Sequence, residues 1–264
     1  MKLTDAHVLV TGASRGIGEG LAREFAAAGS RVTLVARTAD RIGALAGELG
    51  GAAVPADLTD PDQLSGLIAR VEAEQGPLDV LVNNAGFMRV AALMETDVED
   101  ADRTVRLNLL APIELCRQAL PGMIERGRGH VVNISSTAGV GCWPGIATYC
   151  ATKAGLTQFT AGLRADLKGL PVGTTLVEVH IVPTEMGDEL AAYGPTAAAD
   201  RRMRRMGVLT HVDLEKLVQA TVKAVAKDRR HLRRPRRASL IATISEAPRR
   251  STEWIIAGVP PREE

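Results

Sequence analysis

Short apolar runs alternate along this chain with longer stretches in which apolar residues recur at helical spacing. The short runs predict β-strands at residues 7–10, 31–36, 52–56, 78–82, 129–135 and 174–182, with a candidate seventh at 231–234. The periodic stretches predict helices: one ends at Gly29, and others span 40–49, 61–75, 97–126, 147–168 and 212–226. Pro112 could kink the long helix at 97–126.

Strands that alternate with helices predict a parallel sheet with right-handed connections. Helices then cover both faces, so the expected fold class is α/β, with a doubly wound sheet in three layers. Ligands of such folds bind at the carboxyl ends of the strands. Every motif discussed below lies at such an end.

The sequence contains no internal repeat and no low-complexity tract, and we expect a single domain over residues 1–264. Beyond Thr184 the alternation loosens. We interpret residues 184–206 as an irregular substrate lid and residues 236–264 as a basic C-terminal tail.

The composition, with 45% apolar and 24% charged residues, is that of an ordinary globular protein. Three cysteines (Cys116, Cys142 and Cys150) without metal-type pairing argue against a disulfide framework and for a reducing compartment. The first residues lead directly into a strand, and no apolar run reaches the ~18 residues of a membrane span. We therefore expect a cytoplasmic protein, and we expect no metal site.

The net charge is only +1, but residues 200–264 hold 16 Lys and Arg against 8 Asp and Glu. Ten arginines crowd two short stretches: Arg201, Arg202, Arg204, Arg205, Arg229, Arg230, Arg233, Arg234, Arg236 and Arg237. They form either a solvated surface or a face for weak contact with an anionic membrane, where Trp254 and nearby isoleucines would rest. A nucleic-acid site is disfavoured, because no aromatic residues interleave with the arginines.

A glycine-rich turn follows the first predicted strand, with the pattern Gly12-x-x-x-Gly16-x-Gly18. Glycines allow positive φ and let a ligand approach the backbone closely. The following helix N-terminus offers unpaired N–H groups to a pyrophosphate. Its place between strand and helix indicates a dinucleotide site, and the spacing does not match a nucleoside triphosphate P-loop.

Tyr149 and Lys153 stand four residues apart on a predicted helix, so their side chains share one face. A free tyrosine titrates near pH 10, and a nearby cation stabilises the phenolate. Tyr149 is thus a candidate proton shuttle. Ser136, at the end of the fifth strand, can hold a carbonyl oxygen beside it.

Five motifs resemble the short-chain dehydrogenase/reductase family in their order and spacing: Thr11-Gly-Ala-Ser-Arg-Gly-Ile-Gly18, Asp57-Leu58, Asn83-Asn84-Ala85-Gly86, Asn108 in a long helix, and Ser136 with Tyr149-x-x-x-Lys153. The resemblance covers residues 7–186. It implies a Rossmann-type domain, a nicotinamide cofactor, interconversion of a carbonyl and an alcohol, and a homodimer or homotetramer.

The resemblance also implies roles for single residues. Tyr149 would be the acid/base, Lys153 would lower its pKa and bind the nicotinamide ribose, Ser136 would position the substrate oxygen, and Asn108 would support a water chain to Lys153. The implied cofactor-binding residues are Gly12, Ser14, Arg15, Gly16, Ile17, Gly18, Arg37, Asp57, Leu58, Asn84, Ala85, Gly86, Tyr149, Lys153 and Thr184. The glycines would face the pyrophosphate, Asp57 and Leu58 the adenine, and residues 84–86 the adenosine side.

Two departures from the family pattern stand out. Val179-His180 replaces the usual Pro-Gly after the sixth strand, although Thr184 stands at the expected offset. His180 either contacts substrate or cofactor or makes an ordinary hydrogen bond. The C-terminal end lacks the frequent Asp-Gly-Gly, so the family's tetramer interface is not carried over.

The end of the second strand indicates the choice of cofactor. An acidic residue there would select NAD, whereas Ala36 stands in its place and Arg37 follows. Arg37 and Arg15 favour a 2′-phosphate, so we expect an NADP(H)-dependent oxidoreductase. The alternatives are a cofactor-binding interaction protein of the same fold without turnover and a sugar-nucleotide epimerase or dehydratase of related fold.

The residues expected around the substrate are apolar or amphipathic: Met88, Val140, Trp143, Met186, Leu190 and Tyr193. They favour a lipophilic carbonyl or alcohol under a mobile lid. The alternative is that these side chains only pack the lid on the sheet.

Overall fold

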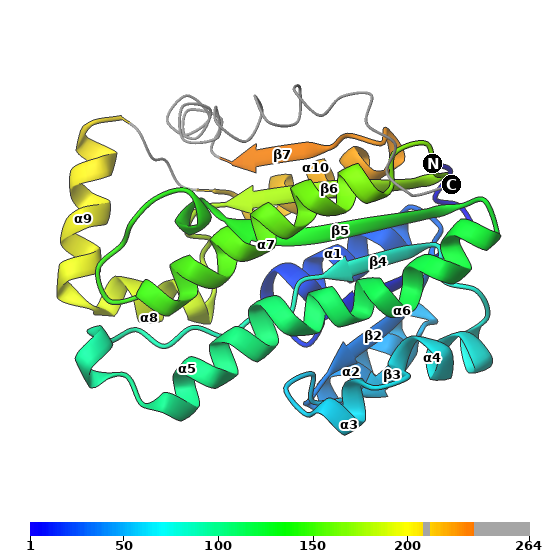
Figure 1. Ribbon diagram of the computed structural model, residues 1–264, viewed down its shortest axis with the longest axis horizontal. Helices are drawn as coiled ribbons and strands as arrows, with labels where there is room; N and C mark the ends of the chain where they lie inside the picture. Colours follow the sequence, from blue (N-terminus) through cyan, green and yellow to red (C-terminus); the bar gives the residue numbers. More distant parts are fainter. Residues whose placement is uncertain (208–211, 235–264) are drawn as a thin grey trace.

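The computed structural model describes residues 1–207 and 212–234. Within them, seven strands form one parallel sheet in the order β3-β2-β1-β4-β5-β6-β7 (Figure 1). The strands are β1 (His7–Thr11), β2 (Arg31–Ala36), β3 (Ala52–Pro55), β4 (Val80–Asn83), β5 (Gly129–Ser136), β6 (Val172–Val179) and β7 (His231–Arg234). The predicted α/β class and the seventh strand are confirmed.

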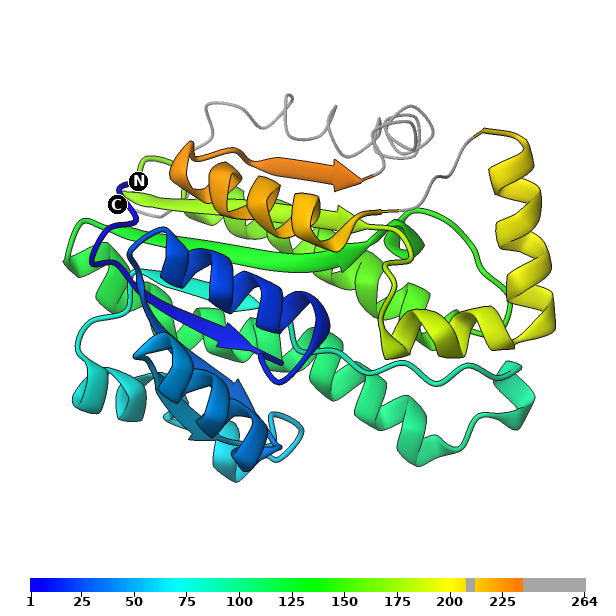
Figure 2. The ribbon, with the colours of Figure 1, turned by 180° about the vertical axis from the view of Figure 1, so that it is seen from behind.

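Two layers of helices cover the sheet, and each buries its own apolar cluster. The helices α1 (Gly16–Ala27), α2 (Ala39–Leu49) and α10 (Leu214–Ala226) cover the face seen in Figure 2. The helices α4 (Leu67–Gln75), α6 (Ala111–Glu125) and α7 (Ala147–Asp166) cover the opposite face, seen in Figure 1. Because both faces are covered, the strands are nearly continuous apolar runs, and every residue of β1 is buried.

The chain builds the sheet in two directions from β1. The strands β2 and β3 follow on one side of it, and β4 to β7 follow on the other. The helix after β1 lies on one face and those after β4 lie on the other, so the two connections diverge. A crevice opens between them at the carboxyl ends of the strands, where such folds bind their ligands.

The predicted helix at 97–126 is interrupted. It consists of α5 (Val98–Val105), the π-helical turn η2 (Arg106–Leu110) and α6. Pro112 has no N–H to donate to the carbonyl of Asn108, and a π turn absorbs the break. The predicted helix at 61–75 likewise splits into α3 (Pro61–Leu64) and α4, because Gly66 is left-handed with φ 63°.

The lid is not irregular, as we had expected. It contains α8 (Glu185–Ala192) and α9 (Gly194–Arg205). Thr184 caps α8 by accepting a hydrogen bond from the Gly187 N–H, and a proline stands in the first turn of α9. Both are ordinary helix-start signals that the loosened apolar pattern obscured. Two further turns are the 3₁₀ segments η1 (Leu93–Glu95) and η3 (Thr137–Gly139).

The basic C-terminal quarter is only partly described. Arg233, grouped above with solvated or membrane-facing arginines, is instead buried on β7 and paired with the carboxylate of Glu178. Arg236, Arg237, Trp254 and the rest of the tail lie outside the described residues. No helix in the described ranges, 1–207 and 212–234, is long and apolar enough to cross a membrane.

His130 on β5 makes the stability of the sheet depend on pH. Its Nε2 lies 2.8 Å from the hydroxyl oxygen of Thr175, and burial lowers the pKa of His130 from 6.5 to about 4. The unfolded chain therefore binds a proton between these pH values that the folded chain does not. The contribution of His130 to the free energy of unfolding is fully present above pH 6.5 and is lost as the pH drops toward 4. At 1.36 kcal/mol per pKa unit, this loss amounts to about 3 kcal/mol.

We predict that His130→Gln, which keeps an N–H donor, flattens this dependence. The measurement is urea unfolding of both proteins between pH 7 and pH 4.5. All other titrating groups are shared, so the difference between the two curves isolates His130. Curves that stay parallel over this range would contradict the prediction.

Candidate active site

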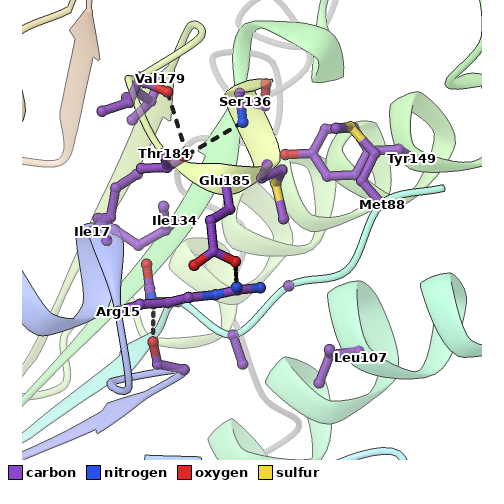
Figure 3. A pocket seen from close by; sticks show the side chains of 18 of the residues that line it. Arg15, Ile17, Met88, Leu107, Ile134, Ser136, Tyr149, Val179, Thr184 and Glu185 are labelled. Carbon is purple, nitrogen blue, oxygen red and sulfur yellow. Dashed lines mark hydrogen bonds and ion pairs between the residues drawn. The ribbon is translucent and has the colours of Figure 1, made fainter. Parts of the chain in front are cut away.

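A cavity of about 790 Å³ lies at the carboxyl ends of the strands. Of the predicted site residues, all but Gly18 and Asn108 line it. The residues after β1, β2 and β3 form one end, and those after β5 and β6, with α7 and the lid, form the other. Figure 3 shows Arg15 and Glu185 meeting at the cavity, with the Tyr149 hydroxyl turned toward Ser136.

The glycine-rich turn has the conformation that its sequence predicts. Gly12 and Gly16 have φ of 63° and 59°, a region that other residues rarely adopt. Helix α1 begins at Gly16, and no described side chain caps its N-terminus. Its N–H groups therefore remain available to an anion such as a pyrophosphate.

Gly18 has a packing role rather than a cavity-facing one. A Cβ atom there would lie 2.2 Å from the Gly12 carbonyl oxygen and 2.5 Å from the Asn84 amide nitrogen. Asn84 donates from this amide to the carbonyls of Thr11 and Gly12, at 2.9 and 3.2 Å. Asn84 thus fixes the shape of the turn, while Ala85 and Gly86 line the cavity.

Thr11 is a structural residue to which the sequence analysis gave no role. Its hydroxyl oxygen accepts hydrogen bonds from the N–H groups of Asn84 and Ala85, both at 3.0 Å. The hydroxyl donates to the carbonyl of Val82 at 3.2 Å. The only sequence feature that could have indicated this role is its position directly before Gly12.

Positive charge gathers at the end of the cavity nearest β2. Arg15, Arg37 and Arg41 line this end, together with Arg103 of α5. Arg41 and Arg103 were missed by the sequence analysis, although Arg41 follows Arg37 by only four residues. Four guanidiniums make this end suitable for a phosphate group.

Two of these arginines already have acidic partners. Arg15 forms an ion pair with Glu185 at the start of the lid, and Arg37 lies 4.0 Å from Asp57. Burial raises the pKa of Asp57, but hydrogen bonds from Thr59 and the charge of Arg37 outweigh it and leave that pKa below its ordinary value. Asp57 is therefore a carboxylate, which suits an acceptor for hydroxyl or amino groups.

Tyr149 and Lys153 lie on one face of α7, as predicted. The Lys153 Nζ is 5.6 Å from the centre of the Tyr149 ring and donates to the Ile134 carbonyl at 2.8 Å. Burial raises the pKa of Tyr149 to about 12, against a hydrogen bond with Ser136 that lowers it, and burial lowers the pKa of Lys153 to about 8. The expected lowering of the tyrosine pKa by Lys153 is not seen in this structure, because Nζ is turned toward Ile134. At neutral pH the phenol is a proton donor.

Asn108 is fully buried on the π-helical turn η2. Its side chain accepts from the Phe87 N–H and donates to the Phe87 carbonyl, both at 2.8 Å, and it lies 3.2 Å from the Thr152 hydroxyl. Thr152 in turn donates to the Tyr149 carbonyl. Asn108 thus joins the segment after β4 to α7, and its role in a water chain stays a prediction.

Ser135 joins α7 to β5 beside Tyr149 and Lys153. Its hydroxyl donates to the Lys153 carbonyl at 3.0 Å and lies 2.9 Å from the Thr157 hydroxyl. Gly139 permits this contact, since a Cβ there would lie 2.8 Å from the Lys153 carbonyl oxygen. The spacing between Ser136 and Tyr149 is therefore held by the Ser135 hydroxyl and by the close approach of α7 to Gly139.

The opposite end of the cavity is largely apolar. The described residues that line it include Met88, Trp143, Ile146, Ile181, Met186 and Leu190. Two residues expected there, Val140 and Tyr193, do not line it. The ring of Tyr193 packs on Gly145 instead, where a Cβ would lie 2.5 Å from it.

Comparisons with known proteins agree with this geometry. The family described as short chain dehydrogenase matches residues 6–193. The NADP-dependent 3-hydroxy acid dehydrogenase YdfG of Salmonella typhi is 36% identical over 214 residues, which are 80% of this chain and 86% of that protein. A crystal structure of a short-chain dehydrogenase from Streptomyces avermitilis superposes with a TM-score of 0.79 at 30% identity, covering 97% of both chains. A second, from Burkholderia phymatum in complex with NAD, has the same TM-score at 22% identity, covers 100% of this chain and 99% of that one, and supports the fold alone.

The close packing of Gly18 predicts that alanine substitutions at Gly18 and at Gly47 change the free energy of unfolding in opposite directions. Gly18→Ala should lower the free energy of unfolding by about 1–3 kcal/mol, because the new methyl group overlaps the Gly12 carbonyl. Gly47→Ala, in the interior of α2 with no atom within 4 Å of the new methyl, should instead raise it by about 0.5–1 kcal/mol. Denaturant unfolding measures both. Equal effects of the two substitutions would show that α1 does not pack this closely on the turn.

Proposed function

The chain belongs to the short-chain dehydrogenase family, and from this premise we propose that it is an NADP(H)-dependent oxidoreductase that interconverts a lipophilic carbonyl compound and its alcohol. One observation carries the proposal. A single cavity joins an arginine-lined end to an end where the Tyr149 hydroxyl stands beside Ser136. The first end suits the phosphates of a dinucleotide, and the second suits a carbonyl oxygen.

The nicotinamide supplies hydride when it is bound, and the protein supplies orientation and a proton. The uncapped N-terminus of α1 would hold the pyrophosphate, and Lys153 would reach the adjacent ribose. Ser136 donates a hydrogen bond to the substrate oxygen, which places that oxygen beside the tyrosine hydroxyl. Tyr149 then gives its proton to this oxygen as the alcohol forms.

The resting protonation states favour this direction. With a pKa of about 12, Tyr149 carries its proton at neutral pH, and Lys153 with a pKa of about 8 is mostly cationic. The phenolate left after transfer is stabilised by the ammonium charge nearby. Oxidation of an alcohol would require the phenolate at the start, so its rate should rise with pH.

The substrate end supports a lipophilic compound. Apart from Lys153, the described residues that line it contribute no lysine or arginine, and the ring of His180 is engaged by other side chains. Among the described residues that line this end, Lys153 is therefore the only lysine or arginine that could meet the carboxylate of a hydroxy acid. The relative from Salmonella typhi is named for 3-hydroxy acids. Lipophilic ketones and 3-hydroxy acids are therefore the two substrate classes to compare by experiment.

The experiment is a turnover panel of ketones with hydrocarbon chains or aromatic rings, together with short 3-hydroxy acids, followed by NADPH absorbance. We expect turnover of the lipophilic ketones. Tyr149→Phe should lower kcat by about 10² to 10⁴ and leave NADPH affinity near that of the wild type, because only the proton donor is lost. Turnover confined to hydroxy acids would refute the substrate class, and near-normal turnover by the variant would refute the role of Tyr149.

Cofactor choice provides a second test. Arg15→Ala should lower kcat/KM about tenfold or more with NADPH and little with NADH, since a charged hydrogen bond to a phosphate is worth roughly 1.5–3 kcal/mol. Glu185→Gln should modestly raise kcat/KM with NADPH, because it removes the carboxylate that competes for Arg15. Arg117→Ala, an exposed arginine on α6, is the control for loss of charge. Equal kcat/KM values for NADH and NADPH in the wild type would exclude NADP dependence.

A further inference from the structure

His180 belongs to the pair Val179-His180, which replaces the Pro-Gly usual in short-chain dehydrogenases. Its ring joins two separate elements. It directly follows β6 and is 6% exposed. Its Nδ1 lies 3.2 Å from the Thr137 hydroxyl, and its Nε2 lies 3.0 Å from a carboxylate oxygen of Asp200 on α9. A solvated strand-end histidine would not be held at both nitrogens by side chains of the protein.

The partners define the direction of these hydrogen bonds. Asp200 also accepts from the Arg204 Nε at 2.5 Å, and its pKa lies below the ordinary value because these hydrogen bonds outweigh its burial. As a carboxylate it can only accept, so His180 carries its proton on Nε2. The Nδ1 then meets the Thr137 hydroxyl at 3.2 Å on the other side of the ring.

Asp200 belongs to a helix that is docked at further points. The Thr196 hydroxyl on α9 donates to the Pro144 carbonyl at 2.6 Å, and the Tyr193 ring, directly before α9, packs on Gly145. The Trp143 ring is tilted against that of His180, with the ring centres 5.3 Å apart. Figure 1 shows α8 and α9 beside the segment that leads into α7. The second half of the lid is therefore fastened to the segment that precedes Tyr149.

Thr137 connects this network to the substrate oxygen. It directly follows Ser136 and begins the turn η3, in which the Ser136 hydroxyl oxygen accepts from the Ala138 N–H at 3.1 Å. The orientation of Ser136 depends on the position of this turn. The His180 ring fixes the turn by its hydrogen bond to Thr137.

We propose that His180 is a positioning residue that couples the docking of α9 to the orientation of Ser136. Through Asp200 it holds the lid helix, and through Thr137 it holds the turn that directs the Ser136 hydroxyl at the substrate. Both connections pass through one buried ring, so the site binds a carbonyl oxygen well only while α9 is docked. This inference rests on the proposed function for its catalytic part, whereas the docking of α9 is independent of it.

The two connections can be cut separately. Thr137→Val removes the hydroxyl that meets Nδ1 and leaves Asp200 in place, and Thr137→Ser restores that hydroxyl. Asp200→Ala releases α9 and leaves Thr137 in place, whereas His180→Ala cuts both connections. Asp188→Asn, on the neighbouring helix α8, is the matched control for loss of a lid carboxylate. Thermal melting of each variant checks that it is folded.

The first readout is turnover of a ketone that the wild type reduces. We expect Thr137→Val and His180→Ala to lower kcat about tenfold, on the order of one hydrogen bond, with KM for NADPH within about twofold of the wild type. Thr137→Ser should be close to the wild type, and the double variant that combines Thr137→Val with His180→Ala should be no slower than His180→Ala alone. An equal loss in the serine and valine variants, or full additivity in the double variant, would overturn the coupling.

The second readout is the rate of trypsin cleavage within α9, at Arg201, Arg202, Arg204 and Arg205, with fragments assigned by mass. We expect Asp200→Ala and His180→Ala to be cleaved several times faster than the wild type, and Thr137→Val and Asp188→Asn at the wild-type rate. Wild-type cleavage of His180→Ala would overturn the proposal. If the wild type reduces no carbonyl, the proposed function fails, and the cleavage rates still decide whether His180 holds the lid.

Discussion

A buried lysine ammonium is the constraint on which this site depends. Lys153 is 4% exposed, and a charge removed from water costs several kcal/mol unless the protein replaces the lost hydrogen bonds. The Ile134 carbonyl supplies one replacement, and the lowered pKa of Lys153 shows that the compensation is incomplete. A cation kept in such a place costs stability, and the proposed function gives a reason to keep it, because its charge would stabilise a phenolate at Tyr149. The surrounding geometry follows from holding it there.

Several local departures from regular structure serve that position. The π-helical turn brings the Asn108 amide to both backbone groups of Phe87, directly after Gly86. Gly139 has no Cβ, and one there would lie 2.8 Å from the Lys153 carbonyl oxygen, closer than real Cβ atoms approach. Locally unfavourable choices of this kind gather at functional sites because the stable core elsewhere compensates for them.

The sequence predicted what depends on local pattern and chain direction. Strand ends coincide in a parallel sheet, so Gly12, Asn84, Ser136 and Tyr149 could be placed together before any coordinates were known. Contacts between distant segments were not predictable in this way. The pairing of Arg15 with Glu185, and of His180 with Asp200, depends on how the lid folds back, and no periodicity encodes that. The π turn was missed for a related reason, since its cause combines Pro112 with an asparagine whose partners lie 21 residues earlier.

The two attachments of the lid differ in strength, and this difference matters for ligand entry. Arg15 and Glu185 are each more than half exposed, and such ion pairs contribute about 0–1 kcal/mol because solvent screens them. The side chains of His180 and Asp200 are only 3% and 16% exposed, so solvent screens their contact much less, and Thr196 and Tyr193 reinforce it with a further hydrogen bond and packing. A fluctuation that opens the cavity therefore breaks the Glu185 contact first, while α9 stays docked. Under the proposed function, a dinucleotide would then replace Glu185 at Arg15 without disturbing Ser136. The weak attachment stands where the cofactor would enter, and the strong one stands where the substrate oxygen would be held.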